Sequence, residues 1–394
     1  MKIEMSTVLA LAFISLQELF EKGLRLWYRP FESWEAFIAT LSRGPSVFLS
    51  LESKTGLLYL IAGFLTALAV YYIYRRELPE EYRGSALSYI FPRSIYTHPS
   101  AIVDYKFVGF DLLVRFFIYF PLVAGTGQLV YVMLNSFEVD LSFGLFVESH
   151  YYVRLAIVTL IGIAALDFSV FFSHYLLHKI PFLWPFHEVH HSAEVLTPVT
   201  VHRNHPMDDM VNGIVYGVVG GSLAATYTAV SGNVVSELTI FGLNIFTFAY
   251  YISVYQLRHS HIWLSYGPIM SHIFVSPAQH QIHHSIDRKH WNKNYGFTFA
   301  IWDWMFGCLY VPKEREEIKF GVPEVDPADF STVPRLYFLP FAKSYRRLIA
   351  MIKARSLRFD FDEVAQSARL AQIPESDVNK EQPLTVRTSY AQPK

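Results

Sequence analysis

Long stretches without a charged residue constrain the fold of this chain most strongly. Four such stretches, of 20, 22, 27 and 20 residues, are Thr55–Tyr74, Phe116–Phe137, Met210–Ser236 and Leu238–Leu257. A fifth, Tyr151–Phe172, is interrupted only by Arg154 and Asp167. Because a helix rises about 1.5 Å per residue, roughly 20 residues cross the hydrocarbon core of a membrane. Only 17% of the residues are charged, against about 25% in soluble domains. An all-α, polytopic helical membrane protein with four to six spans is therefore predicted.

Basic residues predict how these spans are oriented. Six of them lie between the first two apolar stretches: Arg75, Arg76, Arg83, Arg93, Lys106 and Arg115. The connection Glu138–Tyr152 contains no Lys or Arg. By the positive-inside rule the first connection is cytoplasmic and the second is outside. The stretch after Tyr151 then returns to the cytoplasmic face, and a hairpin from Met210 to Leu257, turning near Glu237, returns the chain there once more.

The chain divides into three predicted parts: an N-terminal membrane region, residues 1–150; a histidine-rich region, residues 151–312; and a soluble C-terminal extension, residues 313–394. Near the start, the short apolar stretch Met5–Leu16 favours an interfacial or partly inserted helix over a removable signal peptide. In the extension, four apolar residues recur at helical spacing beside basic residues: Tyr345, Leu348, Ile349 and Ile352. This pattern is typical of a helix lying on an anionic cytoplasmic leaflet, or equally of a helix packed against the main body.

Two counts exclude classes of partner and site. The net charge of -1 argues against a nucleic-acid partner, because domains that bind nucleic acid are typically basic. The single cysteine, Cys308, excludes an intramolecular disulfide bond and any zinc or iron–sulfur site built from several cysteines.

Histidines are the most informative residues of the chain. Of sixteen, fourteen fall between His174 and His290. They form one HxxxH and two HxxHH motifs: His174 and His178; His187, His190 and His191; His280, His283 and His284. Residues four apart lie on one helical face, and the i, i+3, i+4 spacing covers about 100° of a helix. Between the two HxxHH motifs lie His202, His205, His259 and His261, and also His272.

This pattern predicts metal binding. Imidazole binds iron, copper, zinc and nickel, and two or three rings on one helical face can bind a single ion. Eight or more clustered histidines exceed the four ligands of a zinc site, so two adjacent metal ions are expected. The absence of an ExxH pair argues against a carboxylate-bridged di-iron bundle. Four other histidines are interpreted as structural: His98, His150, His272 and His290.

At these residues the sequence resembles the fatty acid hydroxylase / sterol desaturase superfamily of integral membrane, non-haem di-iron oxidases. The family pattern is HxxxH or a close variant, then HxxHH, then one histidine after a hydrophobic hairpin, then HxxHH. Nine residues match it: His174, His178, His187, His190, His191, His259, His280, His283 and His284. Asp167, the His205–Pro206 pair and the segment around Asn294 and Asp303 agree as well. The resemblance covers about 145 residues, from Asp167 to Val311.

The chain departs from the family pattern in three respects. Phe171 and Tyr175 stand where the family often has Tyr and Arg. His261 stands where many members have Asn. No HPGG-type haem-binding motif occurs in the sequence, so a fused cytochrome b5 domain is not expected.

The resemblance implies that the nine histidines bind two iron ions, as Fe2+ or Fe3+, and that O2 is the co-substrate. The implied substrate is a lipid or sterol-like molecule of the membrane, hydroxylated or desaturated at a C–H position. Since no haem, flavin or iron–sulfur motif is visible, electrons are expected from a separate donor: a cytochrome b5-like protein, a ferredoxin or a flavin reductase. The implied location is a bacterial inner membrane or the endoplasmic reticulum, with the histidines facing the cytoplasm.

Four polar residues are candidates to support the ligands: Asp167, Asp303, His205 and His261. An acidic residue within an apolar segment is a functional candidate. Asp167 in particular is expected to accept the second ring N–H of a ligand, as carboxylates commonly do at metal sites. His261 is interpreted either as such a supporting group or as an additional ligand.

Other interpretations of the pattern stay open. An ether-cleaving, alkylglycerol-type lipid monooxygenase carries the same motifs as a hydroxylase or a desaturase. A histidine-rich membrane metal transporter predicts histidines strung along a path through the bilayer, whereas these concentrate at one face. A bis-histidine haem carrier predicts isolated histidines on facing helices, which the HxxHH triplets match poorly.

Overall fold

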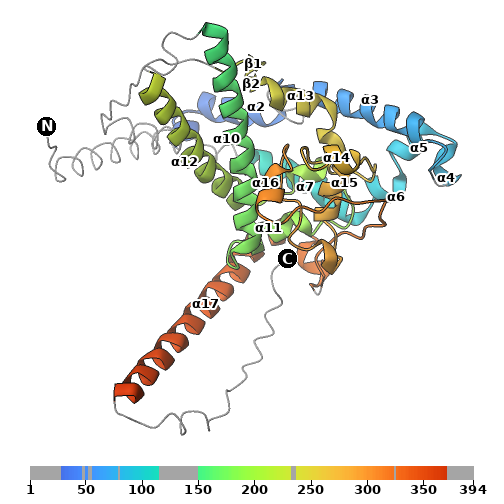
Figure 1. Cartoon of the computed structure of the whole chain (residues 1–394). Helices are drawn as coiled ribbons and strands as arrows, with labels where there is room; N and C mark the ends of the chain where they lie inside the picture. Colours follow the sequence, from blue (N-terminus) through green and yellow to red (C-terminus); the bar gives the residue numbers. More distant parts are fainter. Residues whose placement is uncertain are drawn as a thin grey trace.

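The computed structural model describes residues 28–46, 49–51, 56–78, 80–114, 150–231, 237–323 and 325–370. This part of the chain is mostly helical and contains a single pair of two-residue strands (Figure 1). The predicted helix Met5–Leu16, the apolar stretch Phe116–Phe137 and all but the end of the Glu138–Tyr152 connection lie outside the described residues.

The first helices of the described part lie between residues 29 and 114. They are η1 (Arg29–Phe31), α2 (Trp34–Ser46), α3 (Leu57–Tyr74), α4 (Glu80–Arg83), α5 (Ala86–Ile90), α6 (Arg93–Tyr96) and α7 (Pro99–Val114). α3 coincides with the first predicted apolar span. Its Gly63 lies so close to η4 (Tyr255–Leu257) that a Cβ there would meet the Gln256 side chain at 2.5 Å. The missing side chain therefore lets the two segments pack together.

A pair of long antiparallel helices leads to the histidine motifs. α10 (Tyr151–Lys179) is 29 residues long and carries His174 and His178 near its end. α12 (Pro206–Ser231) packs along it (Figure 1). Within the described part, α3 and α10 are long and apolar enough to cross a membrane. Figure 1 shows α3 lying crosswise to α10, so the two cannot both stand upright in one flat bilayer.

The second limb of the predicted hydrophobic hairpin is not a continuous span. Over Leu238–Leu257 the structure has β1 (Thr239–Ile240) paired antiparallel with β2 (Leu243–Asn244), then the nine-residue α13 (Ile245–Ser253) and η4. Gly242 has a φ of 77° in the turn between the strands, and the Asn244 side chain caps α13. Nine residues rise only about 14 Å, less than half of the hydrocarbon thickness. The predicted second span is wrong, because apolar composition does not reveal these backbone turns.

The remaining elements are short and surround the ends of α10 and α12. They are α11 (Trp184–His191), η3 (Pro198–His202), α14 (Gly267–Met270), α15 (Pro277–His283), η5 (Arg288–His290), α16 (Ile301–Met305) and η6 (Pro327–Phe330). Arg203, which is 1% exposed, connects α7, α11 and η6. Its guanidinium pairs with Asp104 at 2.7 Å and donates to the Val189 and Phe330 carbonyls. Because an unpaired buried charge is costly, this network fixes the position of α11.

α17 (Val333–Leu370) attaches the C-terminal extension to the body. Tyr337 in its first turns is buried. Lys343 pairs with Glu188 of α11 at 3.0 Å. Of the two interpretations of this extension, packing against the main body therefore holds for the first turns. Tyr345 and Ile352 are exposed, and the rest of the helix projects away from the body (Figure 1).

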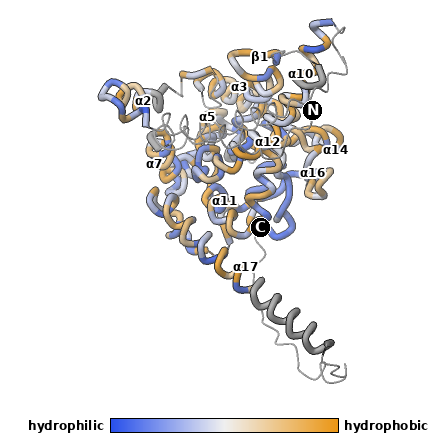
Figure 2. Tube along the Cα trace, turned by 90° about the vertical axis from the view of Figure 1, so that its left-hand side faces the viewer, coloured by the Kyte–Doolittle hydropathy of each residue, from blue (hydrophilic) through white to orange (hydrophobic). Residues whose placement is uncertain are grey.

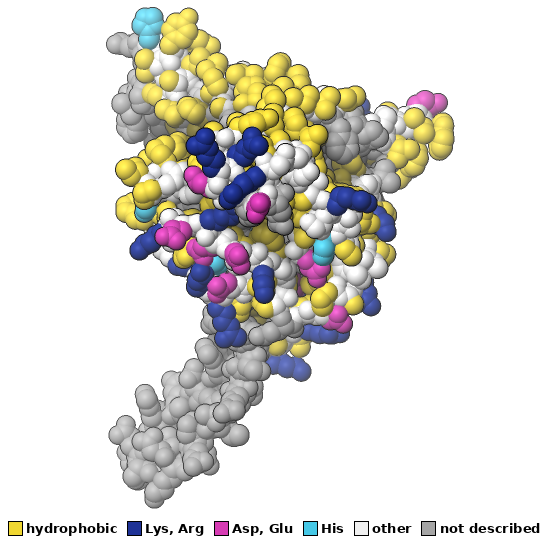
Figure 3. Space-filling view, turned by 90° about the vertical axis from the view of Figure 1, so that its right-hand side faces the viewer, with side chains coloured by type: hydrophobic (Ala, Val, Ile, Leu, Met, Phe, Trp, Pro, Cys, Tyr) yellow, Lys and Arg dark blue, Asp and Glu magenta, His cyan; other side chains and the backbone are white. Residues whose placement is uncertain are grey.

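Apolar side chains are exposed over one region of the surface. Leu57, Ile61 and Leu65 follow one another at one-turn intervals on α3 and are 56%, 50% and 56% exposed. Figure 2 shows hydrophobic residues dominating the region around α3 and β1. In Figure 3 the upper part of the face is covered by hydrophobic side chains, and the Lys, Arg, Asp and Glu side chains lie mostly below them. An exposed apolar surface of this kind fits association with a membrane.

Candidate metal centre

α10 presents the first two histidines of the site. The helix is continuous to Lys179, so His174 and His178 project from one face with ring centroids 5.0 Å apart. Nδ1 of His174 lies 2.9 Å from the Tyr295 carbonyl oxygen. Because a carbonyl oxygen only accepts, this Nδ1 carries the proton and Nε2 keeps its electron pair.

α11 presents three histidines from a helix whose residues are all buried. Pro185 in its first turn has the backbone geometry that a helix start requires. His187 and His191 lie four residues apart, and each ring centroid is 4.8 Å from that of His178. His190 points from a neighbouring face of the helix toward His259, 5.0 Å away between ring centroids.

α15 presents the second histidine triplet. A capping box begins the helix: the Ser276 hydroxyl accepts from the Gln279 amide, and the Gln279 side chain accepts from the Ser276 amide. Pro277 occupies the first helical position. Caps of this kind typically stabilise a helix start by about 1 kcal/mol. The seven-residue helix and the residue that ends it place three rings in the site: His280, His283 and His284.

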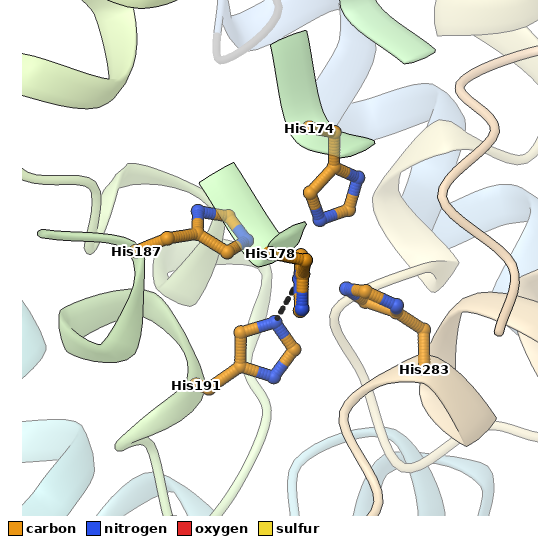
Figure 4. A group of neighbouring side chains, drawn as sticks. All are labelled: His174, His178, His187, His191 and His283. Carbon is orange, nitrogen blue, oxygen red and sulfur yellow. Dashed lines mark hydrogen bonds between the residues drawn. The ribbon is translucent and has the colours of Figure 1, made fainter. Parts of the chain in front are cut away.

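The structure brings all nine histidines of the motif pattern into two compact groups. The five-histidine group consists of His174, His178, His187, His191 and His283. The four-histidine group consists of His190, His259, His280 and His284. Within each group the possible ligand atoms all lie within 4.8 Å of one another. Figure 4 shows the five rings of the first group converging from three helices.

The two HxxHH motifs divide their histidines between the groups in opposite ways. α11 gives His187 and His191 to the five-histidine group and His190 to the four-histidine group. α15 gives only His283 to the five-histidine group and its other two histidines to the four-histidine group. The groups are direct neighbours, since the ring centroids of His191 and His284 are 4.6 Å apart. Each motif therefore joins both groups.

The donor atoms of the five-histidine group fit a metal ion. The Nε2 atoms of His174, His187 and His283 are buried without a hydrogen-bond partner. Their Nδ1 atoms are occupied: that of His283 by the Lys293 carbonyl at 2.8 Å, and that of His187 by the Asp208 carboxylate at 3.0 Å. A buried polar atom without a partner is costly. Electron pairs that face one enclosed space are satisfied together by a bound cation.

In the four-histidine group the Nε2 atoms lie directly against one another. Nε2 of His259 is 2.9 Å from that of His280 and 3.1 Å from that of His190. Arg258 donates to Nδ1 of His280 at 2.8 Å and to the Gly296 carbonyl at 3.1 Å. A guanidinium only donates, so this Nδ1 accepts and the neutral His280 ring carries its proton on Nε2. His280 therefore releases that proton when Nε2 binds an ion. The two groups therefore differ in the side chain that contacts the Nδ1 atom of a ligand ring. It is the Arg258 guanidinium in the four-histidine group and the Asp208 carboxylate in the five-histidine group.

Burial keeps these imidazoles neutral at pH 7. It lowers the pKa of His187 to about 3. It also lowers the pKa of His190, His191 and His284 well below 6.5, and neighbouring histidines add to this effect. Neutral imidazole is the form that binds a metal ion, so these rings bind without first losing a proton.

Asp167 and Asp303 hold the loop beside the site rather than a ligand ring. Asp167 accepts from the Thr298 amide at 2.7 Å and from the Trp302 indole at 2.9 Å. The structure therefore does not place it where the sequence interpretation did, against a ring N–H. Asp303 accepts from the Tyr295 amide at 2.7 Å, and burial raises the pKa of this carboxyl to about 7. Both carboxyls position the segment whose carbonyls bind the ligand rings.

His205 and His261 lie outside both histidine groups. Nε2 of His205 donates to the Tyr337 carbonyl of α17 at 3.0 Å. Nε2 of His261 donates to the Tyr89 carbonyl of α5 at 2.6 Å. His205 therefore binds its segment to α17, and His261 binds its segment to α5. His261 is not among the possible ligands.

Two side chains contact the ligand rings directly but are not among the site residues expected from the sequence. They are Asp208 and Arg258. Asp208 lies in the first turn of the apolar helix α12, where an acidic residue serves equally well as an ordinary helix start. Arg258 directly precedes His259 at the end of an apolar stretch, where a basic residue is common. An acidic residue near a second histidine motif is the one signal that could have indicated Asp208.

A cavity of about 250 Å³ borders both histidine groups. His174 and His190, one from each group, contribute to its wall. Apolar side chains of α10 form another part of the wall, among them Leu166 and Val170. The cavity therefore gives a molecule with an apolar segment access to both groups at once.

Comparison with known proteins agrees with this site. Residues 159–308 match the sequence model of the family described as fatty acid hydroxylase. The chain is similar to an ornithine lipid hydroxylase of Rhizobium tropici, at 24% identity over 57% of this chain and 63% of that protein. It is similar to an alkylglycerol monooxygenase of Caenorhabditis elegans, at 26% identity over 40% of this chain and 28% of that protein. It is also similar to a Delta(7)-sterol 5(6)-desaturase of Eremothecium gossypii, at 28% identity over 41% of this chain and 40% of that protein.

The chain spans less than two thirds of the length of each of these curated relatives. No solved structure matches it. The resemblance read from the histidine motifs is confirmed, because the family match encloses all nine of these histidines. The similarity to the fatty acid hydroxylase family therefore covers residues 159–308, the part of the chain that holds the site.

Proposed function

We propose that this protein is a membrane-bound oxidoreductase that uses O2 and electrons from a separate donor to hydroxylate or desaturate a C–H position of a lipid or sterol-like substrate. The observation that carries the proposal is the pair of adjacent histidine groups beside one cavity. Similarity to a lipid hydroxylase, an alkylglycerol monooxygenase and a sterol desaturase supports it.

We assign the five-histidine group to one iron ion and the four-histidine group to a second. Two iron ions supply the activation of O2 that attack on a C–H bond requires and that no side chain provides. The protein's own contribution is to orient the rings. The Tyr295 carbonyl, the Lys293 carbonyl and the Asp208 carboxylate each hold one Nδ1 on the outside of the five-histidine group. Outer partners of this kind fix the tautomer and the direction of a ligand ring.

The cavity is the proposed place for the C–H bond that is oxidised. Leu166, Val170 and Phe297 give it apolar walls beside rings from both groups. Apolar walls accept an alkyl segment and keep bulk water away from the reaction. Asp208, Asp209 and Asn212 are the polar side chains that α12 adds to the same space.

We propose an integral, multi-pass location in a bacterial inner membrane or the endoplasmic reticulum, with the histidines facing the cytoplasm. The basic residues up to Arg115 support this orientation. The exposed apolar stripe on α3 supports contact with the membrane. The proposed parts are residues 1–150, 151–312 and 313–394. α13 and η4 return the chain to His259 without the full crossing that the sequence predicts, so we propose fewer than six spans.

An ether-cleaving, alkylglycerol-type monooxygenase is the second candidate, and the similarity to the Caenorhabditis elegans protein favours it. Both candidates use the same metal centre and differ only in the substrate that the cavity accepts. A membrane metal transporter fits less well, because the nine histidines converge on two enclosed groups instead of following a path.

Metal analysis tests the ligand assignment. The purified protein should hold about two iron ions per chain and show no strong Soret band. The H284A variant should lose bound iron and activity while it remains in the membrane. The H290A variant is the matched control, because His290 is equally buried but belongs to neither group. An H284A variant with full iron content and turnover would show that the assignment is wrong.

Lipid mass spectrometry of cells with and without the gene tests the reaction. A gain of one oxygen atom in a lipid indicates hydroxylation, and a loss of two hydrogen atoms indicates desaturation. Disappearance of alkyl ether lipids indicates the second candidate. Complementation with H284A should leave the lipids as they are without the gene. Identical lipid profiles with and without the active gene would refute the proposal.

A further inference from the structure

Part of the cavity wall is polar and belongs to α12. Asp208 and Asn212 lie four residues apart on this helix and both line the cavity. They therefore project from the same face, separated by one turn or about 5.4 Å of rise. Asp208 is engaged with His187 of the five-histidine group. Asn212 is thus one helical turn away from the residue that holds a ligand ring.

One end of the Asn212 amide is engaged and the other is not. The Ser173 hydroxyl, directly before His174 on α10, lies 3.1 Å from the Asn212 side-chain oxygen and 3.0 Å from the Val170 carbonyl. This contact turns the amide nitrogen of Asn212 away from Ser173. Among the residues that the structure describes, none accepts a hydrogen bond from that nitrogen. Asn212 is only half-buried and lines the cavity, so a molecule in the cavity can reach its side-chain amide.

The size of the cavity limits what reaches this amide. The volume of the cavity is about 250 Å³. Pockets that enclose a whole drug-sized ligand start at about 300 Å³. The cavity therefore holds a short segment of a lipid rather than the entire molecule. That segment lies within reach of the Asn212 amide and of rings from both histidine groups.

On the basis of the function proposed above, we propose that Asn212 determines specificity by donating a hydrogen bond to an oxygen atom of the substrate. The substrate class is a lipid with an ether, ester, amide or hydroxyl oxygen a few bonds from the carbon that is oxidised. A neutral hydrogen bond contributes modestly to affinity, about two- to tenfold. Its main effect is to set the register of the alkyl chain, because the oxygen atom fixes which carbon lies beside the imidazoles.

Binding to the redox-inactive protein tests this role without turnover. The full chain, loaded with zinc and placed in lipid nanodiscs, is titrated with radiolabelled 1-methoxyhexadecane and with octadecane, in which a methylene group replaces the ether oxygen. The wild type should bind the ether about two- to tenfold more tightly than the hydrocarbon. N212D and N212L should lose this preference, since neither side chain donates. T226V is the matched control, because Thr226 lies on the same helix, is exposed, and bonds only to the Ser222 carbonyl.

The outcomes separate this inference from the proposed function. An ether preference that survives in both Asn212 variants would overturn the inference, as would a wild type without any preference. Loss of zinc from both variants would also overturn it, because Asn212 would then support the metal centre instead of the ligand. An ether preference in a wild-type protein that fails to oxidise lipids would refute the proposed function and leave the inference standing.

Discussion

Replacement of Asp208 is the sharpest test of how the five-histidine group is held. The carboxylate accepts from Nδ1 of His187 at 3.0 Å, and both side chains are buried. Because burial lowers the pKa of His187 to about 3, the ring is neutral at pH 7 and the contact is a hydrogen bond to a charged acceptor. Such bonds contribute about 1.5–3 kcal/mol, which corresponds to roughly 10- to 150-fold in affinity. Loss of outer partners at known metal sites costs about 10- to 100-fold.

We therefore expect D208N to lower the zinc affinity of the five-histidine group about tenfold, since the amide oxygen of Asn still accepts from Nδ1. D208L removes the acceptor and should lower it about 100-fold. A titration against a zinc-binding chromophore resolves the two metal equivalents, and the affinity of the four-histidine group should stay unchanged. D326N is the matched control, because Asp326 is exposed and only caps η6. If D208L binds both zinc ions as tightly as the wild type, the assigned role of Asp208 is wrong.

Three further predictions follow from the described contacts. K343M removes the ammonium group that pairs with the buried Glu188 carboxylate, and it should lower the free energy of unfolding by about 1–3 kcal/mol. The double variant K343M/E188Q should recover part of the lost melting temperature. No recovery in the double variant would contradict the pairing. In G296A a Cβ would meet the Asp303 carboxylate at 2.7 Å. Because Asp303 holds the segment whose Tyr295 carbonyl contacts the His174 ring, the metal content should fall. Unchanged metal content would contradict this prediction. Burial lowers the pKa of His187 to about 3 and that of its neighbours well below 6.5, so each ring gains a proton on unfolding below pH 6.5. Metal-free protein should therefore lose about 1.4 kcal/mol per pH unit and per ring as the pH falls, measurable by denaturant unfolding; a stability that does not change with pH would argue against buried neutral rings.

The possible ligands could be predicted from the sequence because their geometry is local. His174 and His178 are four residues apart, and a helix brings any such pair to one face. The triplets beginning at His187 and His280 repeat one spacing, which a helix converts into one arrangement of rings. Hydropathy likewise predicts α3 and most of α10, because long, mostly apolar stretches are typical of helices that cross or line a membrane.

The supporting groups could not be predicted, because they depend on contacts between distant segments. The carbonyl oxygens of Tyr295 and Lys293 hold ligand rings, and a backbone carbonyl leaves no mark in the sequence. Asp167 was expected beside a ring but binds amides more than 130 residues away, such as that of Thr298. The break in the predicted span Leu238–Leu257 depends on a two-residue turn, which charge counting does not detect.

The division of the histidines between the groups has a consequence for how such chains diverge over generations. The neighbours His190 and His191 belong to different groups, although a single peptide bond separates them. Deletion of one residue just before them would rotate both rings by about 100° around the helix, so that neither would reach its own partners. A change of length within α11 or α15 therefore harms both ion positions together, whereas a change within α10 harms only the five-histidine group. A descendant with only one ion should consequently keep the ancestral length of α11 and α15.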